Sequence, residues 1–163
     1  MVFAAVVLGR AAVLDGKNVL QTQAYGAEAR GSLTKSEVII SEDKIGYPAV
    51  RKSDLLVTMS QEATNELIDA LRETGALVVD STSVKAIPPT KARVLRFRAT
   101  ETARKVCGDG LYANMIMLGA LLQGFRLVQP ESVEGAIRKS TAEKNLDANL
   151  NAFREGLRLS PDK

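Results

Sequence analysis

Asp54-Leu55-Leu56-Val57-Thr58-Met59 is an apolar, partly β-branched run that predicts a buried strand. Ser60 follows it as a helix N-cap, and the periodicity of residues 61–74 predicts a helix that ends at Gly75. The next apolar run, Ala76-Leu77-Val78-Val79-Asp80, predicts a second strand. A strand, a helix and a second strand in this order form a right-handed crossover between parallel strands. This stretch therefore places the chain in the α/β class.

The sequence on both sides of this unit extends the α/β pattern. Before it we expect a buried helix that ends at Asp15-Gly16, two strands, and a short hairpin arm, at residues 3–14, 18–23, 36–41 and 45–47. After it we expect one strand and four helices, at residues 93–98, 100–106, 111–122, from Pro130, and around Leu146, Leu150, Phe153 and Leu157. The sequence thus predicts one three-layer α/β/α domain over residues 1–163, with a mostly parallel or mixed central sheet and a helical C-terminal third.

Composition narrows the possible functions. The net charge is only +3 and aromatic residues make up 4% of the chain, so a nucleic-acid surface is not expected. The chain has no histidine and one cysteine, which removes the usual ligands of a zinc site or an iron–sulfur cluster. The apolar residues 1–14 are fewer than the ~20 needed to cross a bilayer and lack the features of a secretion signal. We therefore expect a cytoplasmic protein that binds neither nucleic acid nor membrane.

Several polar or small residues have a structural interpretation. Cys107 is expected to be a small buried residue, with the alternative that the charges of Arg104-Lys105 lower its thiol pKa. Asn114, in an apolar helix, is expected to bond a neighbouring loop, and Gly119 and Gly124 allow close approach of another backbone. A basic cluster is expected to be a solvated face, with an anionic partner as the alternative. This cluster comprises Arg138, Lys139 and Lys144.

Three of the predicted strand ends are polar. They are the segments Gln23–Arg30, Met59–Gln61 and Asp80–Thr82. Ligands of open α/β sheets collect at the carboxyl ends of the strands, so the three segments can meet at one rim. For the second and third segments the alternative is that they are ordinary polar loops.

The first strand end carries the most specific pattern, Tyr25-Gly26-Ala27-Glu28-Ala29-Arg30-Gly31-Ser32. Its two glycines let the backbone turn tightly and present the intervening side chains to a partner. Arg30 can bind a phosphate or carboxylate through a bidentate fork, with Glu28 orienting it and Tyr25 forming a wall of the pocket. The alternative is a surface turn closed by an exposed ion pair, which contributes about 0–1 kcal/mol.

The order Tyr-Gly-x-Glu-x-Arg-Gly at residues 25–31 resembles the signature of the gamma subunit of 2-oxoacid:ferredoxin oxidoreductases. Ser32 stands where that family commonly has a second glycine. The likeness continues along almost the whole chain, in residues 36–41, 47–48, 54–57, 114, 118–119 and 151–156. Its detail is most similar to the 2-oxoglutarate-type enzymes, with the pyruvate and 2-oxoisovalerate types as alternatives.

The resemblance implies a subunit of an enzyme that oxidatively decarboxylates a 2-oxoacid with coenzyme A, giving an acyl-CoA, carbon dioxide and reduced ferredoxin. Thiamine diphosphate and magnesium then lie between the alpha and beta subunits, and iron–sulfur clusters lie in other chains or domains. This chain is expected to bind no cofactor, to be inactive alone, and to assemble with the alpha, beta and ferredoxin-like subunits, with ferredoxin as electron acceptor. It is also expected to shape the approach of coenzyme A. The residues expected to contact coenzyme A or a partner subunit are Tyr25, Gly26, Glu28, Arg30 and Gly31.

The same resemblance bears on the start of the chain. Members of the family begin with a strand and a glycine-rich loop before the helix that corresponds to residues 2–14, and neither precedes Val2 here. We therefore expect the sequence to be short at its N-terminus, which would leave an open strand edge able to pair in a homodimer of the isolated chain. The competing function is a free-standing Rossmann-like nucleotide-binding module, which the lack of a G-x-G-x-x-G or P-loop motif disfavours.

Overall fold

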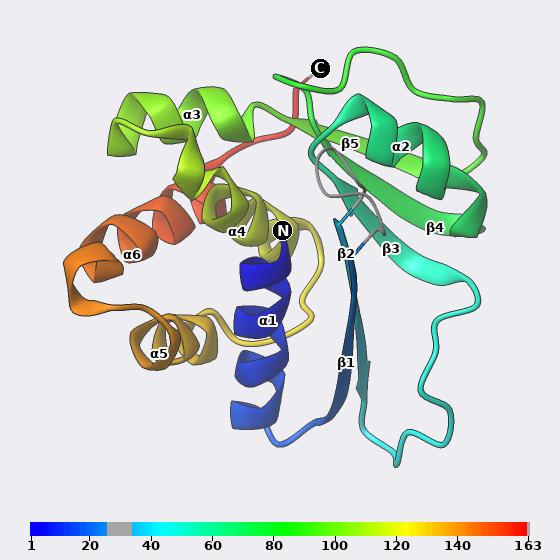
Figure 1. The fold of residues 1–163 in the computed structure, drawn as a ribbon, viewed down its shortest axis with the longest axis horizontal. Coiled ribbons are helices and arrows are strands. Elements are labelled where there is room, and N and C mark those ends of the chain that lie inside the picture. The colour runs from blue at the N-terminus through cyan, green and yellow to red at the C-terminus, as the bar shows by residue number, and fades with distance from the viewer. Residues whose placement is uncertain (26–33, 163) are drawn as a thin grey trace.

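The computed structural model describes residues 1–25 and 34–162, and in these residues the strands form two sheets (Figure 1). One is an antiparallel hairpin and the other is parallel, with the strands in chain order. The hairpin consists of β1 (Asn18–Tyr25) and β2 (Thr34–Ser41), and the parallel sheet consists of β3 (Ser53–Thr58), β4 (Leu71–Asp80) and β5 (Arg93–Phe97). The helices are α1 (Val2–Leu14), α2 (Gln61–Leu67), α3 (Ala99–Cys107), α4 (Ala113–Gly124), α5 (Pro130–Ser140) and α6 (Glu143–Arg158), with short 3₁₀ turns at Ile68–Ala70 and Gly110–Tyr112.

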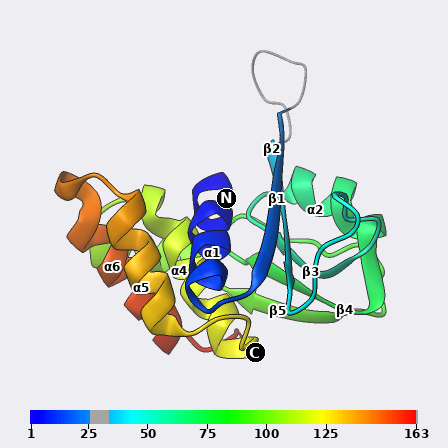
Figure 2. The ribbon, with the colours of Figure 1, turned by 90° about the horizontal axis from the view of Figure 1, so that it is seen from below.

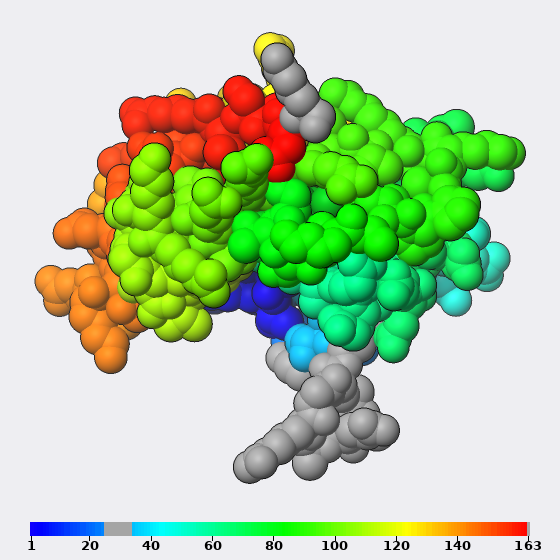
Figure 3. Space-filling view, turned by 90° about the horizontal axis from the view of Figure 1, so that it is seen from above, coloured from blue at the N-terminus to red at the C-terminus, as the bar shows by residue number. Residues whose placement is uncertain are grey.

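The hairpin and α1 lie between a helical side and the parallel sheet. Figure 1 shows α4, α5 and α6 on one side of α1, and the parallel sheet with α2 on the other side of the hairpin. Figure 3 shows these two sides from above, with part of α1 visible between them. α1 packs against α5, α4 and both strands of the hairpin. The predicted α/β class, the parallel strands and the helical C-terminal third are confirmed.

β4 is the central strand of the parallel sheet and is buried on both faces. Val78 packs into the larger core together with the helices, whereas Leu77 and Val79 pack into a smaller core on the opposite face. All three side chains are fully buried. Because a parallel strand of this kind has no solvent face, the run from Ala76 to Val79 is apolar without alternation.

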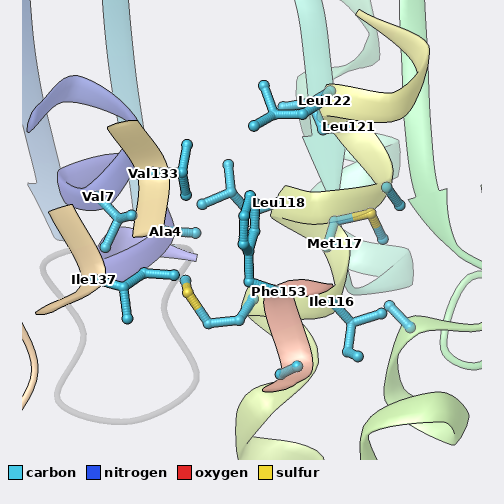
Figure 4. Close-up of a cluster of buried hydrophobic side chains, with 14 of the residues drawn as sticks. Ala4, Val7, Ile116, Met117, Leu118, Leu121, Leu122, Val133, Ile137 and Phe153 are labelled. Carbon is cyan, nitrogen blue, oxygen red and sulfur yellow. The ribbon is translucent and has the colours of Figure 1, made fainter. Parts of the chain in front are cut away.

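α4 passes through the larger core, so its residues Met115–Leu122 are buried on every side of the helix. Figure 4 shows Leu118 of α4 beside Phe153 of α6, with Val133 of α5 and Val7 of α1 close by. Phe153 is fully buried, and burial of such a side chain contributes about 1.5–3 kcal/mol. These four helices, together with α3 through Ala99 and Ala103, thus share one core.

α1 ends where the sequence predicts. Gly16 has φ +79°, a left-handed conformation that glycine adopts without strain. The N–H groups of Gly16 and Lys17 donate to the carbonyls of Val13 (3.0 Å) and Ala12 (2.9 Å). These bonds satisfy the end of the helix and turn the chain into β1.

The helix predicted over residues 61–74 is too long, and the prediction that Gly75 stops it is wrong. α2 ends at Leu67, and β4 already begins at Leu71. The pairing of β3 with β4 shifts between Ser53 and Leu55, which indicates a bulge in β4. A Cβ on Gly75 would lie 2.7 Å from the carbonyl oxygen of Asp54, so this glycine lets the two backbones approach at the bulge.

Two smaller predictions also differ from the structure. Residues 45–47 form no strand; they belong to the connection between β2 and β3. Asn114 is half-buried, and its Oδ1 accepts a hydrogen bond from the N–H of Met115 (2.9 Å). This bond lies within its own helix, whereas the sequence predicts a bond to a neighbouring loop.

Residue 162 is anchored on the parallel sheet, because the N–H of Asp162 donates to the carbonyl of Arg96 on β5 (2.8 Å).

Candidate functional site

The hairpin carries the segment that the sequence identifies as the candidate site. β1 and β2 pair in one continuous register from Asn18 opposite Ser41 to Tyr25 opposite Thr34. Figure 2 shows this end of the hairpin reaching beyond the helices and the parallel sheet. Tyr25 is the last residue of β1, whereas the other four predicted contact residues lie outside the described residues. These are Gly26, Glu28, Arg30 and Gly31.

A charged network braces the hairpin near this end. Lys35 Nζ lies 2.6 Å from Glu37 Oε1, and the hydroxyl of Thr22 on the opposite strand donates to Glu37 Oε2 (3.3 Å). Burial alone would raise the pKa of Glu37, but the hydrogen bond and charge of Lys35, with bonds from Thr22 and the backbone of Val50, hold that pKa below its usual range. Glu37 is therefore ionised at neutral pH and links both strands to the connection that follows β2.

The other end of the hairpin is tied to the end of α1. Lys17 Nζ lies 3.3 Å from Glu42 Oε1 and donates to the carbonyl of Leu127 (3.3 Å). Asn18 Nδ2 donates to the carbonyl of Glu42 (3.0 Å). The described part of the hairpin is thus anchored at its base by Lys17 and Asn18 and braced near Tyr25 by Glu37.

The polar side chain at the end of β4 serves the fold. Asp80 is fully buried, and its carboxylate accepts hydrogen bonds from the N–H of Thr82 (3.1 Å) and from the N–H (3.3 Å) and hydroxyl (2.5 Å) of Thr100. It also accepts a longer bond from the hydroxyl of Ser83 (3.5 Å). The carboxylate therefore joins the end of β4 to the start of α3, which favours the structural interpretation of this strand end.

The polar residues after β3 also have structural roles. The hydroxyl of Ser60 accepts from the N–H of Ala63 (3.2 Å) and caps α2, as predicted. Gln61 Oε1 accepts from the N–H groups of Lys85 and Ala86 (both 3.0 Å), and its Nε2 donates to the carbonyl of Ala86 (2.7 Å). The ends of β3 and β4 do lie on one rim of the sheet. The hydrogen bonds of Gln61 at this rim hold the connection that follows β4.

Cys107 is half-buried at the end of α3. Burial raises the pKa of its thiol above the ordinary value, and the nearby charge of Glu155 adds to this, against a hydrogen bond with Asn151 that lowers it. The alternative of a thiol activated by Arg104-Lys105 is therefore wrong. Cys107 packs against the larger core as a structural residue, although it is half-buried and not fully buried.

A hollow that the sequence does not predict lies between α1, β1 and α5. It has a volume of about 520 Å³, and the apolar residues Val6, Gly9 and Val19 are among those that line it. Arg10 and Lys139 line it as well, and they are 129 positions apart in the sequence. Two signals in the sequence point toward it: Arg10, a single charge inside an otherwise apolar helix, and the basic cluster that contains Lys139.

The described residues lack both a cluster of metal ligands and a membrane-spanning helix. Among residues 1–25 and 34–162, no group of three or more His, Cys, Asp or Glu side chains is placed to hold a metal ion. No helix in the same residues is both long and apolar enough to span a bilayer.

The fold defines an α/β protein with a three-stranded parallel sheet, an attached hairpin and a helical C-terminal third. The chain belongs to the pyruvate ferredoxin/flavodoxin oxidoreductase family, whose sequence pattern matches residues 1–159. The family expected from the hairpin motif is thereby confirmed.

Individual relatives narrow the position within the family. The 2-oxoglutarate synthase subunit KorC of Methanothermobacter thermautotrophicus is 39% identical over 98% of this chain and 88% of its own length. The ketoisovalerate oxidoreductase subunit VorA of the same organism is 34% identical over 91% of this chain and 31% of its own length. The crystal structure of a keto/oxoacid ferredoxin oxidoreductase gamma subunit from Geobacter sulfurreducens superimposes with a TM-score of 0.84 and 35% identity, covering 95% of this chain and 88% of that one. The chain is therefore a gamma-type subunit of a multisubunit oxidoreductase.

Proposed function

We propose that this chain is the gamma subunit of a 2-oxoglutarate:ferredoxin oxidoreductase, and that it works in a complex with alpha, beta and ferredoxin-like subunits in the cytoplasm. The observation that carries the substrate assignment is the 39% identity to a 2-oxoglutarate synthase subunit over nearly the whole length of both chains. The identity to the ketoisovalerate subunit is lower and covers a third of that protein. Family membership favours such a subunit over a free-standing nucleotide-binding module. We take residues 1–163 as one domain.

In this proposal the cofactors belong to the partner subunits. Thiamine diphosphate with magnesium supplies the decarboxylation chemistry, and iron–sulfur clusters pass electrons to ferredoxin. The described residues of this chain do not fit either metal group, because no three potential carboxylate, thiolate or imidazole ligands are grouped in them. No step of the reaction is therefore assigned to these residues.

The proposed role of the hairpin is to present residues 25–31 to coenzyme A or to a partner subunit. Supporting this role, the hairpin is braced by Glu37 and anchored by Lys17, and it reaches beyond the rest of the molecule (Figure 2). An arginine offers five donors in a planar fork that suits a phosphate or a carboxylate. Arg30 is the residue proposed to make this contact, with Glu28 and Tyr25 beside it.

The substrate is tested with the complex reconstituted from this chain and its partner subunits. Reduction of ferredoxin is measured with 2-oxoglutarate, pyruvate or 2-oxoisovalerate, each with and without coenzyme A. We expect the highest kcat/KM with 2-oxoglutarate and no turnover when this chain is omitted. A preference for another 2-oxoacid would overturn the substrate assignment, and full activity without this chain would overturn the subunit role.

The loop is tested with Arg30→Ala in the same complex, with Arg104→Ala on the exposed side of α3 as the control. We expect Arg30→Ala to raise the KM for coenzyme A or to weaken assembly at least tenfold, because a charged phosphate or carboxylate would lose its partner. The control should change neither quantity. If Arg30→Ala matches the control in both the KM for coenzyme A and the assembly of the complex, Arg30 contacts neither coenzyme A nor a partner subunit.

We also propose that the isolated chain forms a homodimer through the free edge of β3. In the described residues β3 pairs with β4 on one side alone, and an open strand edge is a template for pairing with another chain. Sedimentation of the isolated chain over a range of concentrations tests this. A monomer at every concentration would contradict it.

A further inference from the structure

The outward side of α1 is more apolar than a solvent-facing helix normally is. By helical periodicity, Val2, Val6, Gly9 and Val13 fall on one face of α1. Val13 is 60% exposed and the adjacent Leu14 is 48% exposed, so two of the five exposed large apolar residues of the described chain are neighbours here. A helix that is apolar all round is normally covered on every side. This face of α1 is therefore expected to have a partner.

The same face opens onto the hollow between α1, β1 and α5, which we call the α1 groove. Its lining residues are Val6, Gly9, Arg10, Val13, Leu14, Val19, Gln21, Ala136 and Lys139. Gly9 faces β1, since a Cβ there would come to 3.4 Å from Val19 and 3.8 Å from Gln21. α1 lies between α5 and the hairpin (Figure 1), so these elements form the walls of the groove.

The charge of the α1 groove is of one sign. Arg10 and Lys139 line it, and no aspartate or glutamate does. The guanidinium of Arg10 donates to the hydroxyl of Ser140 (2.7 Å) and to the carbonyl of Lys139 (3.4 Å), so it is held at the end of α5. Neither cation forms an ion pair with another described residue. The groove thus presents two positive charges beside apolar lining residues, and its complement is an acidic residue next to an apolar side chain.

The shape of the groove favours a protein over a small ligand. Small-molecule sites enclose most of the surface of their ligand, whereas Arg10, Val13, Leu14 and Lys139 at this groove are all exposed. An apolar centre bordered by charged residues is the usual anatomy of a protein–protein interface. Because the chain is a gamma-type subunit of a multisubunit oxidoreductase, the other subunits of that complex are available as protein partners.

We propose that the α1 groove binds another subunit of the same complex, which packs an apolar side chain against Val6 and Val13 and places a carboxylate against Arg10 and Lys139. This inference rests on the proposed function, because it takes its partner from that complex. It adds a contact surface separate from the sequence motif at residues 25–31.

Charge reversal tests the electrostatic half of the proposal. Lys139→Glu puts a negative charge in the groove, and Lys105→Glu is the matched control, because both lysines are exposed in the last turn of a helix. The tagged chain is co-expressed with its partner subunits, and the dissociation constant of the assembled complex is measured by titration. We expect Lys139→Glu to raise this constant at least tenfold over Lys105→Glu, because like charges would face each other. Equal values would overturn the charge assignment.

The apolar half is tested with Val13→Asp, and Leu111→Asp is its control, since Leu111 is 79% exposed outside the groove. Hydrogen exchange of the unmodified chain, free and in the complex, adds a measurement that does not depend on the folding of a variant. We expect Val13→Asp alone to impair assembly, and we expect the complex to slow exchange at residues 6–21 and 133–140.

The outcomes separate this inference from the proposed function. If the unmodified chain does not assemble with these subunits, the proposed function fails and the inference fails with it. If the complex forms but residues 6–21 and 133–140 are not protected, the inference alone is overturned. Protection of these residues by coenzyme A in the isolated chain would also overturn it, because the groove would then hold a small anionic ligand.

Discussion

Gly119 of α4 and Gly156 of α6 face each other where the two helices cross. A Cβ on Gly119 would lie 2.2 Å from the carbonyl oxygen of Phe153, and a Cβ on Gly156 would lie 2.1 Å from the carbonyl oxygen of Ile116 and 3.0 Å from the Cα of Gly119. These distances are far below van der Waals contact, and the atoms concerned are backbone. The two helices therefore approach to a separation that only glycine permits at both positions, and this crossing positions the helical side of the fold.

We expect Gly119→Ala to destabilise the chain by about 3 kcal/mol or more, because the added methyl group would push two helix backbones apart in a packed core. Gly135→Ala on α5 is the control: there a Cβ would meet only the side-chain tip of Leu14 at 3.5 Å. That change should be neutral or stabilise by up to about 1 kcal/mol through helix propensity. Urea unfolding followed by circular dichroism measures both free energies, and equal values would show that the crossing tolerates a Cβ.

Asp80→Asn should also be strongly destabilising. The carboxylate of Asp80 is fully buried and accepts from two N–H groups and from the hydroxyl of Thr100, and an amide in its place would turn donor hydrogens toward some of these donors. We expect a loss of about 3 kcal/mol in the free energy of unfolding. Asp54→Asn, whose side chain is 79% exposed beside Arg72, should cost less than about 1 kcal/mol. A loss at Asp80 as small as that at Asp54 would contradict the structural role of the buried carboxylate.

The elements that the sequence predicts correctly are those whose local structure is determined by a local pattern. The apolar run at residues 76–79 and the Asp15-Gly16 stop of α1 both appear as expected, because burial on two faces and a left-handed glycine each leave a direct signal in the sequence. The family followed from the motif at residues 25–31 together with an ordered set of further short segments along almost the whole chain. Gly119 was correctly expected to allow close approach, although its partner Gly156 was not identified.

The errors arise where tertiary contacts override a local pattern. Residues 71–74 have helical periodicity, but they pair with β3 through a bulge, and Gly75 serves the contact with Asp54 rather than a helix end. The α1 groove could not be predicted in this way, because Arg10 and Lys139 are far apart in the sequence and come together only when α5 packs on α1. Side-chain charge alone did not distinguish Lys139 from the solvated residues beside it.

Cys107 should react slowly with thiol reagents at neutral pH. Burial raises the pKa of its thiol, so the reactive thiolate is scarcer than in an ordinary cysteine, and partial burial limits access as well. We expect alkylation by iodoacetamide at pH 7.5 to be several times slower in the native chain than in the chain unfolded in urea, and to accelerate as the pH rises. Since this is the single cysteine of the sequence, mass spectrometry of the intact chain follows it directly. A native rate equal to or above the unfolded rate would indicate an activated thiol.

Glu134 and Arg154 join α5 to α6 through two parallel bonds of 2.7 Å, and this pair should make the stability of the chain depend on pH. The hydrogen bond and charge of Arg154 hold the pKa of Glu134 below its usual range, with burial opposing. A carboxyl whose pKa is lower when folded stabilises the chain above the unfolded glutamate pKa of about 4.3, and this stabilisation is lost as the pH falls through the folded pKa. Glu134→Gln should therefore lower the urea midpoint at pH 7, and the difference from the unmodified chain should shrink as the pH falls below about 4. Asp147→Asn is the control, because Asp147 is exposed, lies past the first turn of α6 and forms no ion pair with another described residue; it should change the urea midpoint little at either pH. A difference that stayed constant from pH 7 to pH 3 would mean that Glu134 acts through packing and not through its charge.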